Sequence, residues 1–246
     1  MIEDIWTVMW KEFKEILPQR GEMRIGAFSR FIVPIFLLGM FLPWQFGNEW
    51  IQSPVTLLSW AWLPAFLVIS LVADAFAGER ERHTLETLLA SRLSDETILF
   101  GKIGASVGYG LGLTLISMLV GLVTINLVYR TDGLLLYSAD AALIAIASGF
   151  LIALMVTSVG ALISLHAPTV RQAQQTLSIS FMILWFGAIF GVQALPVEWT
   201  TNMMQFLMTV GEINLILTAM ALLVTVDIGL MLIAIARFKR ARLILD

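Results

Sequence analysis

Residues 78–92 read GERERHTLETLLASR and hold the densest charge in the chain. They stand between two long apolar runs, roughly 54–77 and 99–129. Each run is long enough to cross the hydrocarbon core of a bilayer, which takes about 20 apolar residues. A charged segment between two such spans must lie in water. The stretch therefore predicts a short connector on one side of a membrane.

The connector also carries an apolar stripe. At helical spacing its leucines share one face and its charges spread over the rest, with Leu85, Leu88 and Leu89 set against Glu81, Arg82 and Glu86. An arbitrary charged loop is usually only solvated. Here the stripe within the charged run favours docking onto another protein or onto the membrane surface.

The composition excludes a soluble globular protein. Hydrophobic residues make up 59% of the chain and charged residues 13%, whereas soluble domains are about a quarter charged. We therefore predict an all-α integral membrane protein with one transmembrane domain over residues 1–246. The absence of cysteine excludes disulfides, thiolate metal sites and a thiol nucleophile.

Six apolar runs are long enough to span the membrane as helices. Their approximate bounds are 25–46, 54–77, 99–129, 139–166, 173–195 and 213–236. Ser94 is placed to cap the third helix, with two acidic residues in the first turn that follows.

Residues 1–18 predict a helix that lies along the membrane rather than across it. Apolar and charged side chains occupy opposite faces over residues 2–17, and Pro18 ends the pattern. Two tryptophans on the apolar face suit the interface. Charges early in this segment argue against a cleavable signal peptide.

The basic residues orient the chain. All of the lysines and arginines except Arg130 fall on one side of the six predicted spans. By the positive-inside rule, both termini and the connector are cytoplasmic. We expect a multi-pass protein of the cytoplasmic (inner) membrane of a prokaryote.

The outer segment 196–212 is too apolar for a free loop and too short to span. It predicts either a re-entrant pair of short helices or one helix on the outer surface. Met203, Met204 and Met208 lie in it; thioethers can bind a soft metal such as Cu(I), but methionine more often fills space in packing. We predict no metal site.

The chain has little catalytic chemistry, so we predict no enzyme activity and no cofactor of its own. Gly101-Lys102 lacks the upstream glycine and the following Ser or Thr of a phosphate-binding loop. His83 and His166 have no metal-ligand spacing. Nothing in the pattern indicates a nucleic-acid partner.

Two features inside the spans suggest more specific roles. Gly104, Gly108 and Gly112 recur every fourth residue, which lets another helix approach closely. Asp227 lies ten residues before Arg237, about 15 Å along a helix and hence near mid-membrane. Such a carboxylate either lines a translocation path or hydrogen-bonds to Ser or Thr on neighbouring helices, and both readings stay open.

The connector resembles the signature of ABC-2 type transporter permeases. The likeness rests on ERERHTLETLLAS at 79–91, on Leu93-Ser94, and on ILFGK at 98–102. His83 stands where that family usually has glycine, and Arg92 where it usually has proline. The opening WKEFKE at 10–15 is similar to the N-terminal elbow helix of the family.

The resemblance implies a permease that exports a substrate together with a second permease copy and separate ABC ATPase subunits, which bind ATP and Mg²⁺. The segment 79–93 would then be the cytoplasmic coupling helix between spans two and three. It implies these ATPase-coupling residues: Glu79, Glu81, Arg82, Thr84, Leu85, Glu86, Leu88 and Leu89. Two alternatives remain open, namely a stand-alone secondary transporter or channel that uses Asp227, and an ATPase-binding membrane scaffold or sensor.

Overall fold

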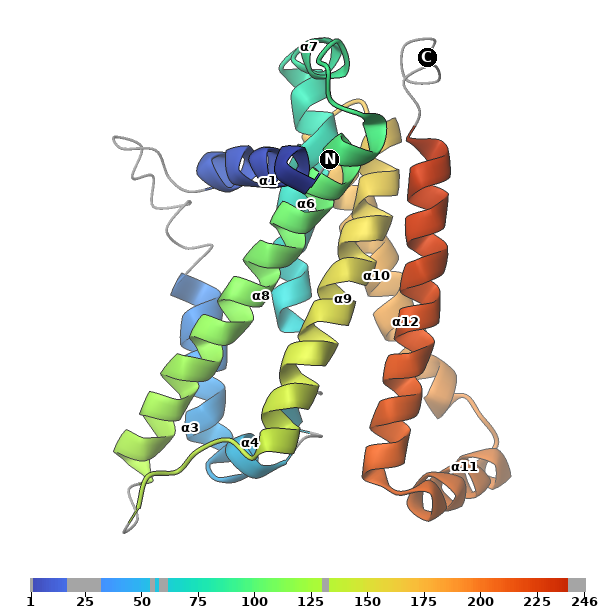
Figure 1. The fold of residues 1–246 in the computed structure, drawn as a ribbon. Coiled ribbons are helices and arrows are strands. Elements are labelled where there is room, and N and C mark those ends of the chain that lie inside the picture. The colour runs from blue at the N-terminus through green and yellow to red at the C-terminus, as the bar shows by residue number, and fades with distance from the viewer. Residues whose placement is uncertain (1, 17–31, 54–55, 58–61, 130–132, 239–246) are drawn as a thin grey trace.

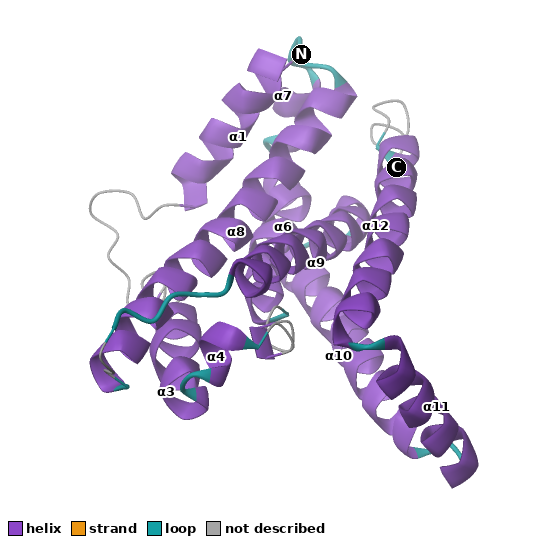
Figure 2. Cartoon of the chain, turned by 60° about the horizontal axis from the view of Figure 1, so that its bottom comes forward, coloured by secondary structure: helices purple, strands orange, loops and turns teal. Residues whose placement is uncertain are grey.

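The computed structural model describes residues 2–16, 32–53, 56–57, 62–129 and 133–238. Within these ranges every regular element is helical, and short loops join the helices (Figure 2). The all-α class is therefore confirmed. Parts of the first two predicted spans lie outside the described residues.

The helices follow the chain from the N-terminal segment to the last span. They are α1 (Ile2–Ile16), the apolar helix Ile32–Phe46 with its π-turn η1 (Leu37–Phe41) and its last turn α3 (Leu42–Phe46), α4 (Glu49–Gln52), α6 (Leu63–Glu81), α7 (Leu85–Leu89), α8 (Asp95–Val128), α9 (Ala139–His166), α10 (Val170–Gln193), α11 (Val197–Val210) and α12 (Glu212–Arg237).

Three of the described helices, α8, α9 and α12, are long and apolar enough to cross a membrane, and Ile32–Phe46 is a shorter apolar helix. Large apolar side chains on their outer faces are exposed, such as Leu119, Leu143 and Leu232. A water-soluble protein rarely exposes so much apolar surface, so these faces suit lipid. The count of six spans stays a prediction.

Local sequence explains where the long helices begin. The Ser94 hydroxyl accepts a hydrogen bond from the Thr97 amide at 3.2 Å, which confirms the predicted cap of α8. Ser138 caps α9 in the same way, through the Ala141 amide at 3.3 Å. Both caps satisfy amide groups that a helix leaves unpaired at its start.

The bundle has two distinct ends (Figure 1). We call them the α7 end, where α1 and α7 lie and α12 finishes, and the α11 end, where α4 and α11 lie. The segment 196–212 contains one helix, α11, rather than a pair. Helix α9 packs against α6, α8, α10 and α12 and forms the centre of the bundle.

Candidate functional site

The connector between α6 and α8 is broken by a tight turn. Helix α6 ends at Glu81, and His83 takes a φ of 57° before α7 begins at Leu85. The segment predicted over 79–93 as one coupling helix is therefore the end of α6, a turn and a five-residue helix. A positive φ favours glycine, since a side chain crowds the backbone there. This accounts for the glycine that is usual where this chain has His83.

Helix α7 turns an apolar residue inward and polar residues outward. Leu85 is buried in a core cluster with Ile98 and Leu165, and Leu88 packs against that cluster. Glu86 and Thr87 are exposed. The side chain of Leu89 lies outside the described residues. Leu85 thus anchors α7 to its own bundle, and the polar side of α7 faces away from it.

A buried ion network lies directly beneath this turn. Lys102 Nζ on α8 lies 2.8 Å from Glu79 Oε1 on α6 and 2.8 Å from Glu12 Oε1 on α1. Lys11 Nζ on α1 also reaches Glu79 Oε1, at 3.1 Å. The Lys102 side chain is 1% exposed and the Glu79 side chain 5% exposed. The network therefore ties three helices together at the α7 end.

The electrostatics of the network follow from its burial. Burial alone raises the pKa of Glu79, but the ammonium groups of Lys102 and Lys11 outweigh it and hold this pKa below its usual value. Burial alone lowers the pKa of Lys11, but Glu12 and Glu79 outweigh it and raise this pKa. Both groups thus stay charged at neutral pH. Lys102 Nζ also lies 5.4 Å from the centroid of the Phe76 ring.

Glycines on α8 let α1 reach this position. A Cβ on Gly101 would lie 2.5 Å from Val8 Cγ1, and one on Gly104 would lie 2.9 Å from Met9 Sδ. One on Gly108 would lie 2.9 Å from the Phe13 ring. A side chain at any of these positions would collide with α1 unless residues of α1 shifted.

The fourth glycine of the series is different. Among the described residues, no atom of another helix lies within 4 Å of the position that a Cβ on Gly112 would take. Of the three predicted packing glycines, Gly104 and Gly108 thus contact α1 and Gly112 does not. Gly101, which was not among the predicted glycines, also contacts α1, through Val8.

A match to a family model covers most of the chain. The model describes ABC-2 type transporters and matches residues 3–210, from α1 through α11. The chain belongs to the ABC-2 type transporter family. A comparison with curated proteins gave no match. Family membership makes the chain a membrane-spanning permease of an ABC-type transporter. It confirms the resemblance to ABC-2 permeases that the sequence of the connector indicated.

In this ABC-2 permease the residues beside the turn hold neighbouring helices. The Arg80 guanidinium donates to the Ala167 carbonyl at 2.8 Å and to the Leu165 carbonyl at 2.6 Å, at the end of α9. The Glu81 carboxylate accepts from the Val170 amide at 3.1 Å, at the start of α10. Both contacts complement the partial charges of helix ends.

The predicted coupling residues of the permease differ in what they contact. Glu79, Glu81 and Leu85 bind other parts of the same chain, and Arg82 pairs with Asp74 at 3.2 Å. Thr84 is exposed, but its hydroxyl donates to the Glu79 carbonyl at 3.3 Å. Leu88 packs against the core cluster, Glu86 is exposed, and the side chain of Leu89 lies outside the described residues. The roles of all eight residues in coupling stay predictions.

Asp227 lies on α12 and is 3% exposed. Neither of its carboxylate oxygens has a hydrogen-bond partner among the described residues. Of the two alternatives for Asp227, the hydrogen bond to Ser or Thr is therefore not present in this part of the chain. A role in translocation stays a prediction. The side chains of Met203, Met204 and Met208 lie outside the described residues. The structure therefore does not test whether they bind a metal.

Sequence reasoning missed the buried network. The sequence places Lys102 in the motif that opens the third span and residues 11 and 12 on the polar face of the N-terminal helix, but it does not bring these residues together. The signal that points to it is the run of glycines on α8, since those glycines mark where α1 lies.

Proposed function

We propose that this permease is driven by a separate ABC ATPase that docks on α7 from the cytoplasm, and that it exports its substrate. One observation carries the proposal: α7 lies at the end of the bundle where the predicted cytoplasmic charges gather, with Glu86 and Thr87 exposed (Figure 1). The ATPase binds ATP and Mg²⁺. In this arrangement both termini are cytoplasmic, and a second permease copy completes the translocation path.

The contacts around α7 suggest how a push on it spreads. Leu85 fixes α7 to the core, and the turn at His83 joins it to α6. Glu79 passes displacement of α6 to α1 and α8 through the lysine network. Arg80 and Glu81 pass it to α9 and α10. Movement of one short helix therefore acts on five others.

The experiment reverses an exposed charge on α7. Glu86→Lys changes no contact that holds the fold, because Glu86 is exposed. We expect the purified variant to lose association with the ATPase subunit and to lose stimulation of ATP hydrolysis in vesicles. Glu198→Lys, an exposed glutamate at the α11 end, is the matched control.

The same experiment has an outcome that would contradict the proposal. Association of the Glu86→Lys variant at the wild-type level would place the docking surface elsewhere. A thermal midpoint equal to that of the wild type shows that the variant is folded. A double charge reversal at Glu81 and Arg82 is less informative, because Glu81 also accepts a hydrogen bond at the start of α10.

A second candidate function rests on Asp227, whose buried carboxylate has no partner among the described residues. In a secondary transporter this group would carry a proton or bind a cation. The test is flux in vesicles that contain the permease alone and an imposed proton gradient. Flux without ATPase that Asp227→Asn abolishes supports this function, and no flux excludes it.

A further inference from the structure

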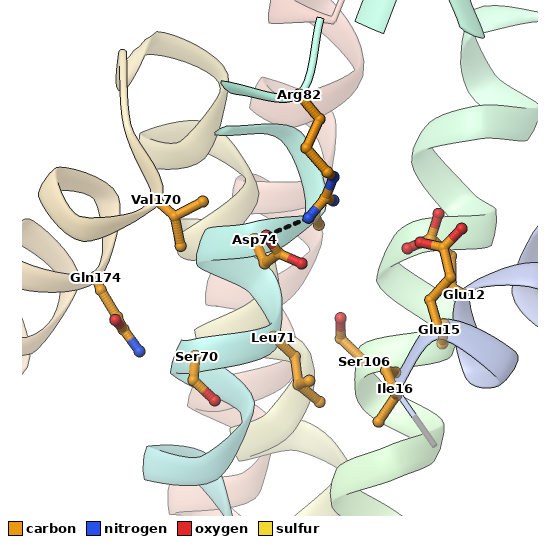
Figure 3. A pocket seen from close by; sticks show the side chains of 12 residues that line it. Glu12, Glu15, Ile16, Ser70, Leu71, Asp74, Arg82, Ser106, Val170 and Gln174 are labelled. Atoms are coloured by element: carbon orange, nitrogen blue, oxygen red, sulfur yellow. Dashed lines mark hydrogen bonds and ion pairs between the residues drawn. The ribbon is translucent and has the colours of Figure 1, made fainter. Parts of the chain in front are cut away.

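A cavity of about 260 Å³ opens between α1, α6, α8 and α10 (Figure 3). The polar lining includes Glu12 and Glu15 from α1 and Asp74 from α6. Ile16 and Leu71 supply apolar wall. A cavity with one acidic side and one apolar side suits the head and the first carbons of a cationic amphiphile.

The charges on the lining are unbalanced. Three carboxylates face the cavity, while Arg82 is the cation among its described lining residues. Glu12 is already paired with Lys102, which lies outside the cavity lining: Lys102 Nζ is 2.8 Å from Glu12 Oε1, and the Lys102 side chain is almost fully buried. Glu15 and Asp74 have weaker partners. Lys11 lies 3.4 Å from Glu15 and Arg82 lies 3.2 Å from Asp74, with all four side chains about half exposed.

Half-exposed pairs of this kind exchange easily. Surface ion pairs contribute about 0–1 kcal/mol, so an incoming cation can replace Arg82 on Asp74 at little cost. A buried pair such as Lys102–Glu12 does not exchange in this way. Glu15 and Asp74 are therefore the carboxylates available to a ligand.

An independent observation points to the same ligand. Ser106 lines the cavity from α8, is 4% exposed, and has no hydrogen-bond partner among the described residues. Figure 3 shows its hydroxyl between the carboxylates of α1 and that of Asp74. A serine hydroxyl in the wall of a cavity can accept a hydrogen bond from the N–H donor of a ligand.

We propose that this cavity binds a primary ammonium group carried by an amphiphile. The three N–H donors of such a group match Asp74, Glu15 and the Ser106 hydroxyl, and its alkyl stem lies against Ile16 and Leu71. The ammonium replaces Arg82 on Asp74. Because Arg82 begins the turn that leads to α7, occupancy of the cavity frees that turn from α6. The binding site itself does not depend on the ATPase.

The probe is dodecylamine, which is protonated at pH 7 as lysine is. Binding to the purified permease is measured by native mass spectrometry and by the shift in thermal midpoint. We expect saturable binding that falls at least about tenfold in Asp74→Asn, which loses a charge-assisted hydrogen bond. Ser106→Leu fills the cavity and abolishes binding. Glu3→Gln removes an exposed carboxylate from the same helix α1 and leaves binding unchanged.

Dodecyltrimethylammonium separates hydrogen bonding from charge, because it is a cation without N–H donors. We expect it to bind at least about tenfold more weakly than dodecylamine. Equal affinity for the two probes, or equal dodecylamine binding by the wild type and by Asp74→Asn, overturns the proposal. Asp74 is half exposed, so Asp74→Asn folds, and Glu15→Gln provides a second variant with the same expected loss.

Two competitors identify the source of the ammonium group. Displacement of dodecylamine by ethylamine shows that a free amine suffices. Displacement in phosphatidylethanolamine nanodiscs, but not in phosphatidylcholine nanodiscs, shows that a lipid headgroup is bound. Either result supports the ammonium site. Displacement by neither overturns it.

Discussion

Replacing Lys102 by methionine tests the buried network beneath the turn to α7. Lys102 Nζ lies 2.8 Å from one carboxylate oxygen of Glu79 and 2.8 Å from one of Glu12. Methionine keeps the length of the side chain and removes its charge. The variant leaves two carboxylates close together, and Lys11 Nζ, 3.1 Å from Glu79, is the cation that remains beside them in the described part of the chain.

The magnitude follows from the burial of the three groups. Removing one partner of a buried ion pair costs about 3–5 kcal/mol, because the other partner stays buried and charged. Lys11 compensates in part, so we expect a loss of about 3 kcal/mol in the free energy of unfolding. Lys11→Met is the matched control. Lys11 is about half exposed, and we expect a loss of no more than about 1 kcal/mol there.

The assay is SDS titration in mixed micelles, followed by tryptophan fluorescence. The chain has eight tryptophans, so the fluorescence reports unfolding of the whole molecule. The double variant Glu79→Gln/Lys102→Met should regain part of the loss, since it removes one uncompensated charge. Equal losses in Lys102→Met and Lys11→Met, within about 0.5 kcal/mol, would refute the reasoning.

Three further predictions concern the same region. Gly108→Leu should displace Phe13 and make α1 susceptible to protease, whereas Gly112→Leu should leave the digestion pattern unchanged because the space beside it is open. His83→Val should lower the free energy of unfolding by about 1–3 kcal/mol, because a β-branched residue resists a positive φ, while His83→Gly should change it little. The pKa of Glu79 is lowered in the folded state, so its stabilising effect is present above the unfolded value of 4.5 and is lost as pH falls through the folded pKa. The stability advantage of the wild type over Glu79→Gln, measured by SDS titration at a series of pH values, should therefore be constant near neutral pH and disappear well below pH 4.5; an advantage independent of pH would contradict the assignment.

Composition and apolar run length predict the membrane class and three long helices, because these properties are local. The break in the connector is not predictable in this way. The spacing of Leu85, Leu88 and Leu89 fits one helix whether or not the chain turns just before them. Histidine adopts a positive φ more often than most residues other than glycine, but its presence alone does not predict the turn. Its occurrence where the family has glycine is the sole clue, and the structure explains that clue.

The network could not be predicted because its members meet only after the helices pack. Glu12 and Lys102 are 90 residues apart in the chain. Their contact depends on α1 crossing α8 at Gly104 and Gly108, and the sequence does not say which helix approaches those glycines. The acidic cavity has the same origin, since α1 supplies Glu15 and α6 supplies Asp74.

The central claim is that an ATPase docks on α7, and site-specific photo-cross-linking tests it most directly. A photoreactive residue is placed at Glu86 on α7, or at Leu134 at the exposed opposite end of the bundle, in cells that also contain the ATPase subunit. We predict a cross-link to the ATPase from position 86 and none from position 134. A cross-link from position 134, or none from position 86 in a complex that still hydrolyses ATP on stimulation, would contradict the account.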